Sequence, residues 1–408
     1  MATGNIVAGI LSQGLGINAT TDLVKKSFSS MITRLMPNGS APLFGLTSML
    51  KDEVAVQTEH GFFTKTMIFP SVTASGTGEL IGATTFTNMV STAQLIPGMI
   101  LLNPLTRELI LVNTVVSATS ITVTRAFGTV AAVAIAANQV LYQVGTAFEE
   151  GSARPTAMNI SAVRVTNYTQ IFRNSWALTD SARATQVIAG ETTLSESRGE
   201  CAAFHASDIE RAIFFSQKFS GTKNNAPIRQ MDGLINQVTV NAAANVNTAA
   251  ATTNYTQLEA LLDPVFNVTT DPKVANERVL FVGGAAKRVL NNIGRLNGTY
   301  QLVDGQTSYG LQFSSFKTSR GTFRMIEHPM FNSNVTWAAM AVAVDLSSFN
   351  LAYLGDRKTV ASEFGTNGQA LENGIDAVGG SLTTELTCLV KNPAANAVIY
   401  GLTAAAAG

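Results

Sequence analysis

The 408-residue chain is short of charged residues. Lys, Arg, Asp and Glu together make up 13% of it, about half of the ~25% that is usual in soluble domains. Its 27 basic and 27 acidic residues cancel, whereas a protein that reads nucleic-acid sequence usually carries a basic bias. A monomer of this size normally stays soluble through a charged surface. We therefore expect much of this surface to be covered by copies of the same chain.

Cysteine, signal sequences and long apolar runs are also scarce. Cys201 and Cys388 form no CxxC pair and no metal-ligand spacing, so we expect two reduced, partly buried small side chains from a reducing compartment. The segment 1–16 lacks both a basic start and an unbroken apolar core, which argues against a secretory signal. The longest apolar runs, 130–137 and 337–344, are far below the ~20 residues of a membrane helix.

Catalytic and metal-binding patterns are missing as well. The three histidines, His60, His205 and His328, are widely separated and have no partner at i+4, so a metal site would need an accidental convergence. We expect His205 to be a satisfied histidine on a helix and His328 to end a strand. No Gly-x-Ser-x-Gly nucleophile elbow occurs. The sequence thus predicts no catalytic residue, no metal ligand and no cofactor.

Two further patterns have a chemical and a structural interpretation. The adjacent carboxylates Asp52-Glu53 and Glu149-Glu150 point apart as sequence neighbours, so we expect solvated loops or salt bridges between subunits instead of an acid–base pair. Gly283-Gly284 joins a predicted strand to a predicted helix, as in phosphate-binding turns. The glycine-rich fingerprint and the Gly-Lys-Ser/Thr ending are absent, and Lys287 belongs to the helix. We interpret this segment as a tight turn.

The first half of the chain divides into an arm and a β region. Residues 1–60 suggest an extended arm with one helix over 22–36, where apolar residues recur at helical spacing. Residues 62–175 look entirely β, with a hairpin over 112–125 that turns near Ala118-Thr119 and a predicted inward face shared by Leu109, Leu111, Ile121 and Val123. Only three charged residues, Arg107, Glu108 and Arg125, lie between positions 80 and 148.

The clearest predicted element is a long helix over 193–221. Thr193 and Glu196 have the spacing of a capping box, and Gly221 suits a C-terminal cap. An apolar stripe follows at Ala202, Ala206, Ile209 and Ile213. Such a helix would be about 40 Å long at ~1.5 Å per residue, well above the ~11-residue mean.

The second half, 230–408, indicates a mixed α/β region. Asn254 with Gln257 resembles a capping box that opens a helix, and Pro264 must kink or end that helix. The segment 278–282 reads as a short buried strand before a helix over 285–295. Further strands are expected over 323–326, 339–344 and 382–390.

This order of elements, an arm, a long β excursion, one very long helix and an α/β region, resembles the coat fold of tailed double-stranded-DNA phages, typified by the Hong Kong-97 phage. Four stretches carry a closer likeness: 148–152 with 167–172, 229–235 and 379–397. They are similar to coat proteins of the Enquatrovirus, or SU-ten-like, group, whose extended loop carries a β insertion. The resemblance spans most of residues 60–400.

The resemblance implies an α+β phage coat fold with the following parts. They are an arm (1–60), an extended loop (61–175) with a β insertion (about 80–147), a peripheral domain (176–229) with its spine helix (about 193–221), an axial domain (230–340) and closing strands of both domains (341–408).

The same resemblance implies a major capsid protein, made in the host cytoplasm, that self-assembles into the icosahedral head of a virion. Its expected partners are copies of itself in hexamers and pentamers, scaffolding, portal and decoration proteins, and packaged DNA contacted without sequence specificity, but no membrane. No residue can be matched to the Lys–Asn crosslinks of the typical phage. Two alternatives stay open at this point: a secreted β-rich surface or adhesive protein, and an enzyme suggested by the Gly283-Gly284 turn alone.

Overall fold

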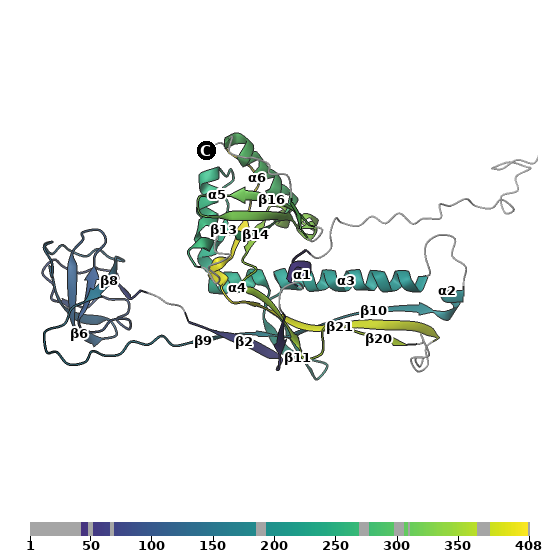
Figure 1. Ribbon diagram of the computed structural model, residues 1–408, viewed down its shortest axis with the longest axis horizontal. Coiled ribbons are helices and arrows are strands. Elements are labelled where there is room, and N and C mark those ends of the chain that lie inside the picture. The colour runs from purple at the N-terminus through teal and green to yellow at the C-terminus, as the bar shows by residue number, and fades with distance from the viewer. Residues whose placement is uncertain are drawn as a thin grey trace, which may run out of the picture. The chain divides into compact units, whose positions relative to one another are not determined.

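The structure is a computed structural model, shown in Figure 1. It describes residues 42–47, 52–65, 69–184, 193–268, 277–297, 306–308, 311–364 and 376–406. The chain divides into two compact units: unit 1 consists of Met1–Phe62 with Val165–Gly408, and unit 2 is Phe63–Arg164. Strands β2 (Glu59–Thr64) and β9 (Val163–Tyr168) pair with each other where the chain leaves unit 1 and returns to it.

Unit 1 contains a five-stranded sheet covered by one long helix. The strands are β1 (Glu53–Ala55), β19 (Phe349–Leu354), β21 (Ala377–Val390), β10 (Gln170–Thr179) and β20 (Val360–Phe364). In Figure 1 the helix α3 (Thr193–Phe215) runs alongside β10 and β21. Burial along β10 alternates, with Phe172 and Trp176 buried, because one face of the strand packs under α3.

The long helix is shorter than predicted. It begins at Thr193 as expected but ends at Phe215, and Gly221 lies inside strand β11 instead of capping the helix. The Ser216 hydroxyl and N–H both donate to the Ala212 carbonyl, at 2.6 and 3.1 Å, and close the last turn. The next residues form a hairpin of β11 (Phe219–Lys223) and β12 (Ala226–Gln230), which turns through Asn224 and Asn225, both at positive φ.

The predicted apolar stripe of this helix is only half right. Ile209 and Ile213 are buried, but Ala202 is exposed and Ala206 is half-buried. The buried face runs instead through Cys201 and His205 to the two isoleucines. A hydrogen-bonded histidine takes the place of an apolar residue there, so a purely apolar pattern selects the wrong face at the start of the helix.

A seven-stranded mixed sheet forms the other part of unit 1. Its order is β13-β22-β18-β14-β17-β16-β15, from β13 (Val246–Thr248), β22 (Ala397–Tyr400), β18 (Ala341–Val344), β14 (Glu277–Val282), β17 (Thr322–Glu327), β16 (Leu311–Lys317) and β15 (Gln306–Ser308). Val279 and Phe281 of β14 face one apolar cluster, and Leu280 and Val282 face another. Both faces of the strand are buried, which explains its unbroken apolar sequence.

Helices α4 (Leu234–Asn241), α5 (Tyr255–Leu262), α6 (Gly284–Asn297) and α7 (Val335–Ala338) accompany this sheet. The capping box predicted for α5 is confirmed: the Gln257 N–H donates to the Asn254 side chain at 2.8 Å, and the Asn254 N–H donates to the Gln257 side chain. The helix ends at Leu262, and Pro264 lies in a short 3-10 helix (Asp263–Phe266), as the proline requires.

Unit 2 is a small β structure with its own core. Its six-stranded sheet has the order β3-β8-β5-β6-β7-β4, from β3 (Ser71–Thr73), β8 (Val140–Thr146), β5 (Met99–Leu102), β6 (Leu109–Ser117), β7 (Ser120–Thr124) and β4 (Thr85–Phe86). The predicted hairpin turn at Ala118-Thr119 is confirmed. The core holds thirteen buried apolar residues, among them Phe86, Met99 and Leu141.

The predicted inward face of β6 is wrong. Ile110 and Val112 are fully buried, whereas Leu109 and Leu111 are only half-buried. Because four consecutive residues of this strand are apolar, the sequence does not show which of them face the core. Glu108 decides it here, because its fully buried side chain shares the face of Ile110 and Val112 and binds Arg125.

Two segments near the start of the chain are anchored in unit 1. Helix α1 (Pro42–Thr47) packs against α3 with Leu43 fully buried, and β1 pairs in parallel with β19. The predicted helix over 22–36 lies outside the described residues.

Candidate functional site

A fully buried carboxylate joins three distant segments of unit 1. Oε1 of Glu210 accepts hydrogen bonds from the Leu43 N–H at 2.8 Å and lies 2.7 Å from Nε2 of His328; Oε2 accepts from the Phe44 N–H at 2.7 Å. Glu210 and His328 are both 0% exposed. The carboxylate therefore caps the first turn of α1 while it holds α3 to the segment that follows β17. We call these four residues the Glu210 junction.

Aromatic rings enclose the histidine of this junction. The His328 ring stacks on Phe331 at 4.7 Å between centroids and meets Phe214 edge-on at 5.1 Å. The prediction that His328 ends a strand is confirmed, since β17 ends at Glu327. Its partner was not predicted, because Glu210 lies 118 residues away in sequence. A charged residue directly beside Ile209 on the buried helix face is the signal that could have found it.

His205 forms a second buried network, between α3 and the five-stranded sheet. Its Nδ1 lies 2.7 Å from Oδ1 of Asn174, and its Nε2 lies 2.7 Å from Oγ1 of Thr384. The Asn174 amide donates to Asp208 at 2.9 Å, which directs its oxygen toward the ring. Burial lowers the pKa of His205, against a smaller opposite effect of Asp208. The predicted satisfied histidine is confirmed.

A third network joins strand β9 to strand β21 and to the segment just before helix α4. The Asn167 side chain donates to the carbonyls of Cys388 and Asp232, at 2.7 and 3.0 Å, and accepts from the Asp232 N–H at 2.7 Å. The Gln237 amide donates to the Asp232 carbonyl at 2.8 Å.

Cys388 and Cys201 are buried free thiols, as predicted, and burial raises the pKa of Cys388 to about 12.

Unit 2 contains a buried ion pair made from two of its three central charges. Arg125 donates through Nε and Nη2 to both oxygens of Glu108, at 2.7 and 2.8 Å. Burial alone would raise the pKa of Glu108, but hydrogen bonds from Arg125, Val133 and Ala126 hold it below its ordinary value. We call this pair the Glu108–Arg125 brace.

The turn at Gly283-Gly284, which resembles a phosphate-binding turn in sequence, has a structural role. A Cβ at Gly283 would lie 2.4 Å from the Ala338 carbonyl oxygen, and the Gly284 N–H donates to the Asn332 side chain at 2.6 Å. Lys287 pairs with Glu327 at 3.1 Å. This is the tight turn that was expected, and protein atoms fill it.

The carboxylate pairs differ from each other. The expectation of a loop or an intersubunit salt bridge is wrong for Asp52-Glu53, because Asp52 pairs with Lys358, and Glu53, in strand β1, pairs with Lys391 of the same chain. Glu149-Glu150 is an exposed loop.

Within the described residues no cluster of His, Cys, Asp and Glu could hold a metal ion, and no described helix is long and apolar enough to cross a membrane.

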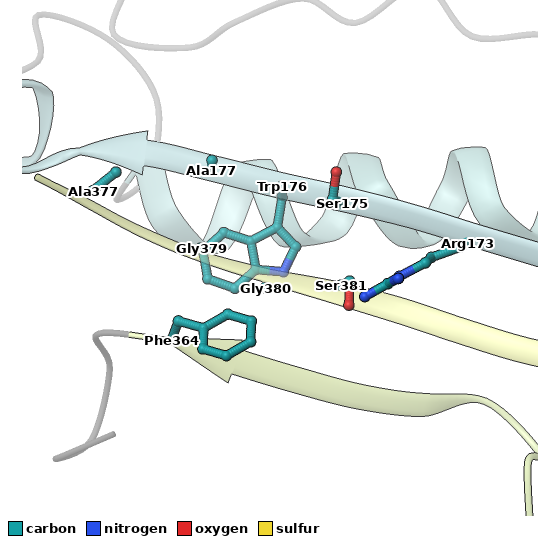
Figure 2. A pocket seen from close by; sticks show the side chains of 9 residues that line it. All are labelled: Arg173, Ser175, Trp176, Ala177, Phe364, Ala377, Gly379, Gly380 and Ser381. Carbon is teal, nitrogen blue, oxygen red and sulfur yellow. The ribbon is translucent and has the colours of Figure 1, made fainter. Parts of the chain in front are cut away.

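A cleft of about 440 Å³ lies in the five-stranded sheet, where it is lined by residues of β10, β20 and β21. Figure 2 shows Trp176 and Phe364 beside Gly379 and Gly380, with Arg173 near the other end. A Cβ at Gly380 would lie 2.9 Å from the Trp176 ring, so the glycine makes room for that ring. Among the described residues of the lining, Arg173 is the one ionisable residue, so these residues form no acid–base pair.

Comparison with known proteins decides what such a chain is. The family described as SU10 major capsid protein matches residues 14–403. The chain belongs to this family. It is 38% identical over 410 residues to the major capsid protein of Pseudomonas phage PaMx41, which covers 98% of this chain and 96% of the relative. The chain is thus a major capsid protein of the phage head, a structural component of the virion and not an enzyme.

Membership of this capsid family confirms the predicted α+β coat fold of the Hong Kong-97 type. Among solved structures, the chain is similar to one from Mycobacterium phage Bobi (10% identity, TM-score 0.47, covering 93% of this chain and 96% of that one). It is also similar to the SrpI encapsulin of Synechococcus elongatus PCC 7942 (11% identity, TM-score 0.44, covering 60% and 80%). The enzyme and secreted-adhesin alternatives are excluded by the family.

In this capsid protein the buried networks connect the parts of unit 1. The Glu210 junction and the His205 network fasten the long helix α3 to helix α1 and to the sheets. Self-assembly into a shell requires subunits of defined shape, and buried, hydrogen-bonded polar groups restrict the core to one arrangement. These side chains therefore hold unit 1 in one arrangement.

Proposed function

We propose that the chain assembles as hexamers and pentamers into an icosahedral head around double-stranded DNA. Membership of the major capsid family carries this proposal. The zero net charge also fits a shell that encloses DNA without reading its sequence. DNA would be contacted only non-specifically, and assembly would take place in the host cytoplasm.

The surface of the isolated chain supports a role in assembly. Large apolar side chains are exposed in both units, including Val56 (88%), Phe69 (86%), Phe204 (63%), Val240 (69%) and Val335 (88%). Contacts between subunits would cover such side chains, and many weak contacts closed by symmetry make a stable shell.

We further propose roles for the parts of the chain. The five-stranded sheet with α3 would be the peripheral domain, and the seven-stranded sheet with α4 to α6 would be the axial domain at the capsomer centre. Strands β2 and β9 would be the base of the extended loop, and unit 2 would be the β insertion of that loop. Residues 1–60 would act as an arm whose part before α1 crosses a neighbouring subunit, since α1 and β1 pack within unit 1 of the same chain.

Scaffolding, portal and decoration proteins would be further partners of the shell. Electron microscopy of particles formed by the expressed chain tests the proposal. We expect closed shells whose reconstruction shows fivefold and sixfold capsomers. Fibres, or oligomers that never close, would contradict it, and a reconstruction with unit 2 at the capsomer centre would contradict the assigned roles.

A further inference from the structure

One end of unit 2 presents a group of exposed apolar side chains. Leu80 is 79% exposed, Ile81 59%, Phe127 41%, Val133 41% and Val130 36%. They belong to two loops, 80–83 and 126–134, that an isolated bridge between Glu79 and Ile135 holds together. We call these five residues the apolar cap.

The Glu108–Arg125 brace lies directly beneath the apolar cap and connects its loops. Arg125 donates to the Leu80 carbonyl at 3.0 Å and to the Val133 carbonyl at 2.6 Å. Glu108 accepts from the Val133 N–H and the Ala126 N–H, both at 3.2 Å. One buried ion pair thus binds the backbone at or beside three of the exposed apolar residues.

The backbone under the cap is held in an unusual conformation. Ala126 has φ of 52°, in the left-handed region that costs a non-glycine residue roughly 1 kcal/mol or more. Its N–H binds Glu108, and the next residue, Phe127, is 41% exposed. A buried charge pair and a strained residue therefore hold in place a group of apolar side chains that unit 2 leaves 36–79% exposed.

The charges near the cap limit what can bind there. Both members of the brace are turned inward, with side chains 0% and 7% exposed, so the brace itself offers no charge to an acidic or a basic ligand, and the five side chains of the cap are apolar. Its side chains together expose on the order of a few hundred Å², the size of functional apolar patches on monomers. A partner that arrives from solution needs about 800 Å² on each side for a stable complex.

We propose that the apolar cap of unit 2 packs against a second copy of this chain within the shell. A neighbouring subunit is already held close by its other contacts, so its effective concentration is high and a small uncharged patch suffices. A separate soluble partner would lack this advantage. The inference rests on the proposed assembly into shells, and it goes further by naming the contact residues.

Thiol protection tests the inference directly. The two native cysteines are buried, so a maleimide would report on an introduced cysteine. Leu80→Cys places the thiol on the cap, and Val116→Cys is the matched control: Val116 is 61% exposed and lies at the opposite end of strand β6 from Leu109. Labelling rates are measured on shells assembled from the purified variant chain and on the same shells after dissociation.

We expect labelling of Leu80→Cys to be at least tenfold slower in shells than in free subunits, with a smaller change for Val116→Cys. Leu80→Glu should fold normally by circular dichroism and form shells that dissociate at a temperature lower by about 5 °C or more, because it forces a charge into an apolar contact. Equal labelling in shells and free subunits would overturn the inference. So would protection of position 80 only in complete phage heads, which would indicate another protein. Absence of shells from the wild-type chain would instead contradict the proposed function.

Discussion

Removal of the Glu210 carboxylate is the sharpest test of how unit 1 is held together. In Glu210→Ala, the N–H groups of Leu43 and Phe44 lose their hydrogen bonds to the carboxylate, and the His328 ring loses its partner in a site where residues 210 and 328 are fully buried. Each buried donor without an acceptor costs about 1–3 kcal/mol. Removing the carboxylate also ends the cost of burying it, so we expect a net loss of about 3–5 kcal/mol in the free energy of unfolding.

Tryptophan fluorescence during urea unfolding measures this loss. The chain has two tryptophans, Trp176 and Trp337, and both lie in unit 1, where Trp337 stacks on Phe215 at 4.4 Å. The signal therefore reports on unit 1 alone. Glu200→Ala, an exposed position on the same helix, should change stability by less than about 0.5 kcal/mol. An equally small effect of Glu210→Ala would refute the reasoning.

Three further predictions concern the same networks. Ile209→Asp should abolish soluble, shell-forming subunits, because it places an unpaired charge where Ile209 is 1% exposed; normal shell yield would show the face is not essential. Glu108→Gln should lower the free energy of unfolding of unit 2, measured by calorimetry, by about 3–5 kcal/mol, since Arg125 stays buried without its counter-charge. The exposed substitution Arg107→Gln should leave that free energy unchanged. Because the folded-state pKa of His205 lies below its unfolded value, protonation favours the unfolded chain. Unit 1 should therefore lose stability as pH falls below about 6.5, and this loss should be smaller in His205→Gln.

Local signals in the sequence were sufficient for several elements. The α5 capping box, the stop at Pro264, the β6–β7 turn and the start of α3 each depend on residues a few positions apart. The end of α3 was misplaced because Gly221 suits a cap equally well as a strand. The Asn224-Asn225 turn, which places Gly221 in a hairpin, was the overlooked signal.

The buried polar networks could not be predicted in the same way. Glu210 and His328 are 118 positions apart, and His205 and Thr384 are 179 apart. Nothing local to either residue identifies its partner, since the pairing follows only from the sheet order and the packing of α3. The shortage of charge in unit 2 was visible, but not that two of its three central charges bind each other and set the parity of β6.

Replacement of unit 2 tests most directly the central claim that unit 1 is the coat fold and unit 2 adds contacts between subunits. Residues 66–161 would be exchanged for a short Gly-Ser linker, which spares strands β2 and β9. We expect unit 1 to keep its tryptophan fluorescence and its unfolding transition. Thermal dissociation followed by light scattering should show shells that are absent or that fall apart at a lower temperature than wild type. Shells of undiminished stability, or an unfolded unit 1, would contradict the account.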